Sequence, residues 1–206
     1  MSLSPDHIKS SSSFKHILTL NYNDIITFVF DYLKKYTFPV IFGYMLSAVL
    51  LIWLIFNRIG LSGEYPFITI LLHSLTGFIL LPVLLVLPHE FLHIIPYWLS
   101  GARNIRIGAK PAELYFYVTA HNYPVGGKQF ILIALTPFIA LSVIMVSLTF
   151  FLPPLWQWSV LAALFMHTTM CAGDLALINF YWVNRDKKII TWDDTDLQEA
   201  YFYEIL

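Results

Sequence analysis

Two histidines and a glutamate lie together in a strongly apolar stretch of the sequence. The run 89–93 reads His-Glu-Phe-Leu-His, and Glu90 is the only residue with a formal charge in the segment 65–102. On a helix, His89 and His93 would lie on one face, one turn apart. This spacing lets two imidazoles bind one metal ion and places Glu90 to take a proton from metal-activated water. The pattern predicts a zinc site that can hydrolyse a bond.

A third protein ligand is needed, because a catalytic zinc ion usually has three of them. The four long apolar stretches of the chain contain only two acidic residues, Glu90 and Asp174. A bare carboxylate inside a lipid bilayer costs about 2.5–3.5 kcal/mol or more, and metal binding is the simplest way to offset that cost. We therefore expect His89, His93 and Asp174 to bind the metal, with Glu90 as the base.

Other polar residues are weaker candidates. His167 is two helical turns before Asp174 and is expected to support the site or to contact substrate. His121 and Asn122 lie in a polar loop and would have such a role only if that loop folds toward the site. Cys171 is one turn from Asp174; it is an alternative zinc ligand, although core packing is the simpler interpretation.

The composition is that of a membrane protein. Of 206 residues, 58% are hydrophobic and 12% are charged, and the mean hydropathy is +0.68. A soluble domain has about 25% charged residues. The net charge of −1 gives no electrostatic basis for binding nucleic acid, and a single cysteine excludes an internal disulfide. The first 20 residues are polar and rich in serine, so no cleavable signal peptide is expected.

Four apolar stretches are long enough to cross a bilayer core, which needs about 20 residues. They run from 38 to 57, from 66 to 99, from 129 to 152 and from 155 to about 183. In the second stretch, Pro82, Pro88 and Pro96 each remove a backbone donor, so we expect a kinked or broken helix. Pro88 could begin a new helical segment at the His-Glu motif.

The basic residues predict the orientation of these spans. Arg58 alone falls between the first and second spans, and no basic residue falls between the third and fourth. If both termini are cytoplasmic, eleven of the twelve Lys and Arg residues lie inside. We expect an integral protein of a bacterial-type plasma membrane, in contact with membrane lipid and with both termini in the cytoplasm.

Three regions follow from this pattern. Residues 1–37 are expected to form a cytoplasmic tail and an amphipathic helix at the membrane interface, residues 38–184 a transmembrane metallopeptidase domain, and residues 185–206 a solvated, acidic cytoplasmic tail. Residues 100–127 are polar, and apolar side chains alternate over 114–119, which predicts a strand with 103–107 as its partner. The expected fold is an all-α membrane protein of about four transmembrane helices, with a β-hairpin-like loop between the second and third.

The order of these motifs resembles a known family. The His-Glu-Phe-Leu-His run is followed by a Gly-Ala-Arg turn at 101–103, a strand-like loop, Thr-Pro-Phe at 136–138 and Gly-Asp at 173–174. This is similar to the zincin-type peptidases grouped as a domain of unknown function, DUF3267, and more distantly to site-2 intramembrane metalloproteases. The resemblance covers about residues 80–183. It implies zinc bound by His89, His93 and Asp174, and Glu90 as the catalytic base.

The resulting hypothesis is a zinc-dependent, membrane-embedded peptidase of the HExxH type. Its substrates would be membrane or membrane-proximal proteins or peptides, and nucleic acid is not an expected partner. An alternative is a non-catalytic membrane zinc-binding or scaffold protein, which includes a degenerate peptidase. Glu90 argues against pure metal binding, because a structural site needs no base beside it. The sequence leaves the substrate's identity and the oligomeric state open.

Overall fold

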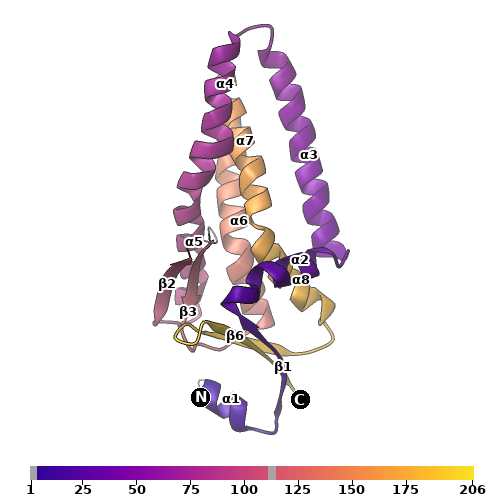
Figure 1. The fold of residues 1–206 in the computed structure, drawn as a ribbon, viewed down its shortest axis with the longest axis vertical. Helices are drawn as coiled ribbons and strands as arrows, with labels where there is room; N and C mark the ends of the chain where they lie inside the picture. The colour runs from indigo at the N-terminus through magenta and orange to yellow at the C-terminus, as the bar shows by residue number, and fades with distance from the viewer. Residues whose placement is uncertain (1–3, 111–114) are drawn as a thin grey trace.

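The chain forms a long helical bundle with a small β-sheet at one end, where both termini also lie (Figure 1). A computed structural model describes residues 4–110 and 115–206. The helices are α1 (Pro5–Ser10), α2 (Ile25–Leu33), α3 (Phe38–Leu61), α4 (Phe67–Leu75), α5 (Leu81–Leu99), α6 (Gly127–Thr149), α7 (Pro154–Met170) and α8 (Ala172–Val183). A 3₁₀ turn, η1 (Tyr22–Asp24), precedes α2, and a π-helical turn, η2 (Thr76–Leu80), joins α4 to α5.

Two small antiparallel sheets accompany the helices. The strands are β1 (Phe14–Asn21), β2 (Ile105–Lys110), β3 (Tyr115–Ala120), β4 (Val125–Gly126), β5 (Ile189–Asp194) and β6 (Glu199–Ile205). One sheet has the order β1-β6-β5-β4, and β2 pairs with β3 in the other. The predicted hairpin between the second and third apolar stretches is therefore present, with Ile105 opposite Ala120. Leu114, which the sequence assigned to the strand, lies outside the described residues.

Within residues 4–110 and 115–206, three helices are long and apolar enough to cross a membrane. They span residues 38–61, 67–99 and 127–149, and the pair α7 and α8 passes the same test together, with a bend of 43° between them. The prediction of a mostly helical fold with long apolar helices is confirmed in this coarse form.

The second apolar helix is continuous, so the break that the prolines predicted as one of two outcomes is absent. Helix α4, η2 and α5 form one helical span of 33 residues, with Pro88 and Pro96 inside α5. The irregularity lies before Pro82, where the Leu81 N–H donates to the carbonyl of Thr76, five residues back. A π turn widens the helix at the place where Pro82 disturbs the regular hydrogen bonds. The His-Glu motif therefore lies within a helix and not at the start of one.

The fourth apolar stretch is bent, where one helix was expected. Cys171 separates α7 from α8, with φ −72° and ψ 12°. A ψ near 0° leaves the α-helical path, so the chain changes direction at this residue. The bend puts Asp174 in the first turn of α8.

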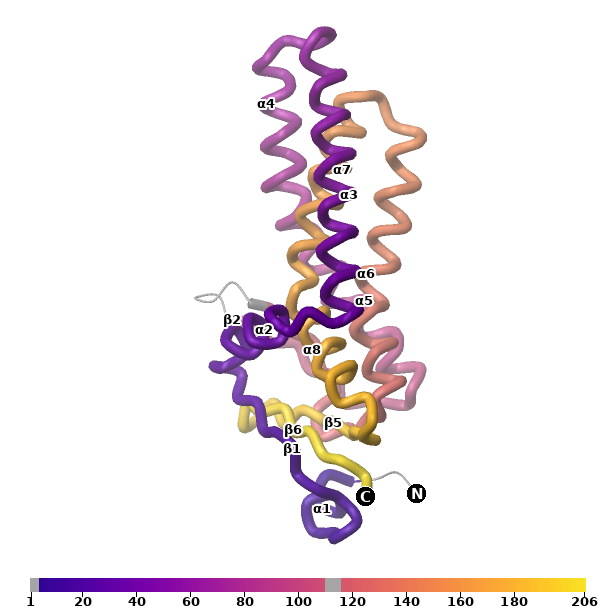
Figure 2. The backbone as a smooth tube through the Cα atoms, turned by 90° about the vertical axis from the view of Figure 1, so that its right-hand side faces the viewer, coloured from indigo at the N-terminus to yellow at the C-terminus, as the bar shows by residue number. Residues whose placement is uncertain are grey.

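The terminal segments form a sheet, so the expectation of an all-α fold with polar tails is wrong in this respect. Strand β1 pairs with β6, and β6 pairs with β5 (Figure 2). Trp192 and Phe202 are each 1% exposed, and Asp193, expected in solvent, faces the interior through hydrogen bonds to Tyr22 and Thr119. The pairing joins residues more than 180 positions apart (Phe14 to Ile205), which no local pattern can reveal.

Helix α2 crosses the end of the bundle and packs on α8 (Figure 1). The fully buried side chain of Asn179 in α8 fastens the turn between α2 and α3. Its Nδ2 donates to the carbonyls of Tyr32 at 2.6 Å and Lys35 at 3.1 Å, and its Oδ1 accepts from the Thr37 hydroxyl. Buried amides need such partners, and these bonds fix α8 against the start of the first long helix.

The π turn packs closely on α7 at Gly77. A Cβ atom at this position would lie 2.5 Å from the Ser159 carbonyl oxygen and 2.7 Å from the Ala162 Cβ. Backbone atoms cannot move aside cheaply, so only glycine fits here. Gly60, in α3, has no atom within 4 Å of such a Cβ.

We predict that Gly77→Ala destabilises the fold by about 1–3 kcal/mol, because it forces α7 away from η2. Gly60→Ala is the matched control and should be neutral or slightly stabilising, since alanine favours a helix interior over glycine by about 0.5–1 kcal/mol. Thermal unfolding of both variants in detergent measures the difference. Equal melting temperatures would contradict the close packing at Gly77.

Candidate metal centre

Helix α5 presents His89 and His93 on one face. Their ring centroids are 5.2 Å apart, as expected for side chains one helical turn apart. His93 is buried, and His89 is partly exposed. The helical spacing inferred from the sequence therefore brings the two imidazoles together.

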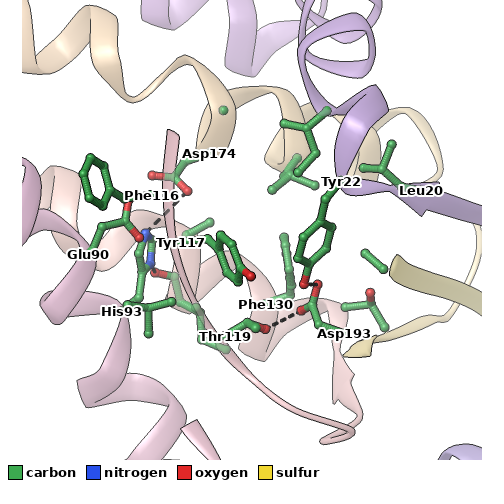
Figure 3. Close-up of a pocket in the computed structure, with 18 of the residues that line it drawn as sticks. Leu20, Tyr22, Glu90, His93, Phe116, Tyr117, Thr119, Phe130, Asp174 and Asp193 are labelled. Atoms are coloured by element: carbon green, nitrogen blue, oxygen red, sulfur yellow. Dashed lines mark hydrogen bonds and ion pairs between the residues drawn. The ribbon is translucent and has the colours of Figure 1, made fainter. Parts of the chain in front are cut away.

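Asp174 reaches these rings from α8. One carboxylate oxygen lies 3.2 Å from His89 Nε2, and the other lies 3.7 Å from His93 Nε2. Figure 3 shows the Asp174 carboxylate pointing toward His93, with Glu90 nearby. Helices α5 and α8 are separated by 72 residues of chain (99 to 172), and the approach occurs in the first turn of α8, directly after the bend at Cys171.

The Nδ1 atoms of both histidines have partners on the side away from Asp174. His93 Nδ1 lies 2.9 Å from the Ile133 carbonyl. A carbonyl only accepts, so Nδ1 carries the proton and the lone pair of neutral His93 is on Nε2. His89 Nδ1 lies 3.2 Å from His167 Nε2. Both rings can therefore direct an Nε2 lone pair toward the same point.

His167 and Cys171 lie on the Nδ1 side of His89, and Asp174 lies on its Nε2 side. The Cys171 sulfur is 3.9 Å from His89 Nδ1 and 3.7 Å from His167 Nε2. The His167 ring is stacked against Phe138 of α6, with an interplanar angle of 6° and centroids 6.3 Å apart. His89, His167 and Cys171 form an alternative group of metal ligands, but neither His167 nor Cys171 lines the cavity described below. The Nε2 side of His89, where Asp174 lies, is therefore the side that faces this cavity.

A cavity of about 250 Å³ adjoins the cluster. His89, Glu90, His93 and Asp174 line one end of it. Glu90 also lies against the backbone of Val118 in β3. The Glu90 carboxylate is thus in contact with a space that can hold water and an extended peptide segment.

The opposite wall of the cavity contains polar residues that the sequence analysis missed. Tyr22 of η1, Thr119 of β3 and Asp193 of β5 line it, together with apolar side chains of α2 and α6. The Tyr22 hydroxyl donates to Asp193 at 3.1 Å, and the Thr119 hydroxyl donates at 2.6 Å (Figure 3). The three residues come from distant parts of the chain, so only the fold brings them together.

His121 and Asn122 lie elsewhere. His121 Nδ1 is 2.8 Å from the Thr195 hydroxyl, and its Nε2 is 3.5 Å from an Asp196 oxygen. Asn122 hydrogen-bonds to the His121 ring, and neither residue lines the cavity. The structure brings His89, Glu90, His93, Asp174 and His167 together, and it puts His121 and Asn122 beside the β5–β6 turn.

The donor atoms fit a zinc ion. Two ligand atoms that are each about 2.0–2.1 Å from a tetrahedral ion lie about 3.3 Å apart. The separations of 3.2 Å from Asp174 Oδ2 to His89 Nε2 and of 3.7 Å from Asp174 Oδ1 to His93 Nε2 are close to this value, although each involves a different oxygen of the carboxylate. Two imidazole nitrogens and a carboxylate oxygen are also the donor types that zinc prefers.

Comparison with known proteins agrees with this chemistry. A family model described as "Putative zincin peptidase", DUF3267, matches residues 82–188. No curated protein and no solved structure gives a match. The matched segment is just over half of the chain and contains His89, Glu90, His93 and Asp174. The chain therefore belongs to the DUF3267 family of zincin-type peptidases.

Proposed function

We propose that this protein is a zinc-dependent peptidase whose metal centre is embedded in a membrane. His89, His93 and Asp174 would hold zinc, and Glu90 would act as the catalytic base. The observation that carries the proposal is the approach of Asp174 to both Nε2 atoms, at 3.2 Å and 3.7 Å, at the end of a cavity that Glu90 also lines. The family match supports the reaction class.

A bilayer around the bundle accounts for its surface. Apolar side chains of α3 such as Phe42, Met45, Ile52 and Phe56 are between 54% and 70% exposed. Soluble monomers rarely expose apolar patches of this extent. We propose that the three long helices and the bent pair α7 and α8 make four spans in a bacterial-type plasma membrane. The terminal sheet and the β2–β3 hairpin, which lies between α5 and α6, would be on the cytoplasmic side.

Bound zinc would supply a Lewis acid that lowers the pKa of water to about 7 and stabilises negative charge on a carbonyl oxygen. The protein's own part begins with Glu90, whose carboxylate would accept a proton from the attacking water. The same carboxylate would then pass the proton to the nitrogen of the departing amine, which completes the cleavage of the peptide bond. Ile133 and His167 would hold the two imidazoles in the orientation that leaves Nε2 available.

The substrate would have to be extended at the site, because the carbonyls of a helix are occupied by hydrogen bonds. Strand β3 pairs with β2 along one edge, and its residues 116–119 line the cavity. An unwound segment could lie along β3 by strand addition. A second cavity, about 480 Å³ and almost entirely apolar, lies between α3 and α6 and shares Ala134 and Asp174 with the first. It offers an apolar route from the bilayer to the centre.

We predict that Glu90→Gln keeps bound zinc but abolishes hydrolysis, because glutamine cannot accept the proton. His93→Ala should lose zinc and activity together, and Asp174→Ala should lower the zinc stoichiometry. Zinc analysis of purified protein and a peptide-cleavage assay measure the two properties separately. Glu64→Gln, an exposed acid in the α3–α4 loop, is the control and should change neither.

Each result has a clear interpretation. Hydrolysis that survives Glu90→Gln would show that another group is the base. Wild-type protein that binds zinc but cleaves no peptide would favour the alternative, a non-catalytic zinc-binding or scaffold protein. Wild-type protein without zinc would contradict both.

His167 gives a separate prediction. If it holds His89 through Nδ1, His167→Ala should weaken zinc binding about 10–100-fold, because the ring would lose its orienting partner. His73→Ala is the matched control, since His73 is also a membrane-helix histidine, but it lies in α4, bonds to Ser159 and does not line the cavity. Competition with a calibrated zinc chelator measures both affinities. Unchanged affinity in His167→Ala would show that His167 only fills space.

The orientation is also testable by labelling. In a Cys171→Ala background, Ser62→Cys, in the α3–α4 loop, should react with a membrane-impermeant maleimide in intact cells. Ser12→Cys, before β1, should react only after the cells are opened, because we expect it in the cytoplasm. The reverse pattern would invert the proposed topology.

A further inference from the structure

The far wall of the catalytic cavity contains an anionic group that the proposed mechanism does not use. Asp193 is half-buried, with part of its surface facing the cavity. Each of its carboxylate oxygens accepts one hydrogen bond, from Tyr22 or from Thr119. A carboxylate has about four lone-pair positions, so each oxygen can accept another bond from a group inside the cavity.

The charges around the cavity are not balanced. Asp174 and Glu90 together carry two negative charges, which would match a divalent zinc ion. Asp193 adds a third, and the two hydroxyls that donate hydrogen bonds to it are neutral. None of the residues that line the cavity, all within the described part of the chain, is lysine or arginine. A positively charged group that reached Asp193 would therefore find a carboxylate with no lysine or arginine of the cavity wall beside it.

Burial makes the ionised form of Asp193 less favourable, so a nearby cation would stabilise it. Loss of water around Asp193 raises its pKa above the ordinary value, while the hydrogen bonds from Thr119 and Tyr22 lower it. A cation beside the group would favour the ionised form and form a strong, charge-assisted hydrogen bond.

The wall also differs in origin from the catalytic end. Tyr22 and Asp193 lie outside the segment 82–188 that the family model matches. Tyr22 comes from η1 and Asp193 from β5. The backbone carbonyl of Asp193 accepts a hydrogen bond from the Asn122 N–H at 2.8 Å. The part of the chain that carries the metal centre is therefore closed over by residues that belong to this chain's own terminal segments.

We propose that Asp193 is a specificity residue that binds a basic side chain, lysine or arginine, of the substrate close to the scissile bond. This inference rests on the proposed peptidase function. Arginine suits the position best, because its planar fork can bond to both oxygens of one carboxylate. Tyr22 and Thr119 hold the carboxylate in place for this contact.

The test measures binding apart from cleavage. Short apolar peptides, each with one arginine moved through successive positions, are compared with twins that carry citrulline, the neutral isostere of arginine. Binding is measured by fluorescence anisotropy on zinc-loaded Glu90→Gln protein. One arginine position should improve affinity about tenfold or more over its citrulline twin, because a hydrogen bond between charged groups is worth more than a neutral one. Adding Asp193→Asn should remove the difference.

A matched variant and a second readout separate the possible causes. Glu90→Gln with Asp196→Asn should keep the arginine preference, since Asp196 is exposed and does not line the cavity. Equal affinities of the arginine and citrulline peptides for the Glu90→Gln protein would overturn the inference, even if the Asp193→Asn variant failed to fold. A preference that persists in Asp193→Asn would also overturn it.

Cleavage by the wild type distinguishes this inference from the function on which it rests. Cleavage of both peptide twins at the same rate would overturn the basic subsite and leave the peptidase intact. An arginine preference in binding without any cleavage would support the subsite and contradict the peptidase.

Discussion

The structure depends on one carboxylate held against two imidazoles inside an apolar bundle. Asp174 would be costly in such surroundings without a partner, and its partners are on a helix that is distant in sequence. The bend at Cys171 directs the start of α8 toward α5. Asn179 then fixes α8 to the start of α3, and the glycine of the π turn lets α7 lie close to the second helix. These features together position the Asp174 carboxylate 3.2 Å from one Nε2 atom and 3.7 Å from the other.

The sequence was sufficient to group the candidate ligands but not to predict their surroundings. His89, Glu90 and His93 could be grouped because helical spacing is local, and Asp174 could be added because acidic residues are so rare in the apolar stretches. The hairpin at 105–120 was predictable from alternation. The bend at Cys171 was not, because no proline or glycine marks that residue itself. Pro88 suggested that a new helical segment begins there, but it lies inside α5, because packing within a bundle tolerates a proline in mid-helix.

The terminal sheet illustrates a different limit. Its strands are short, and the residues that pair in β1 and β6 lie at opposite ends of the chain. Asp193 was read as solvated because its neighbours Asp194 and Asp196 are acidic. Only the fold shows that Tyr22 and Thr119 lie beside it. Helices α5 and α8 contribute the candidate metal ligands and Glu90 to the cavity. Strands β1, β5 and β6 contribute part of the wall that encloses them.

The pairing of β1 with β6 also sets an order of assembly. A chain emerges from the ribosome with its N-terminal part first, so β1 is made long before residues 199–205 exist to pair with it. All four groups of the metal centre, the last of them Asp174, are synthesised before β5 and β6. The newly made bundle would therefore carry its histidines and carboxylates in an open hollow until the last strands arrive. Closure of the cavity would therefore have to wait until β5 and β6 have been made and β6 has paired with β1.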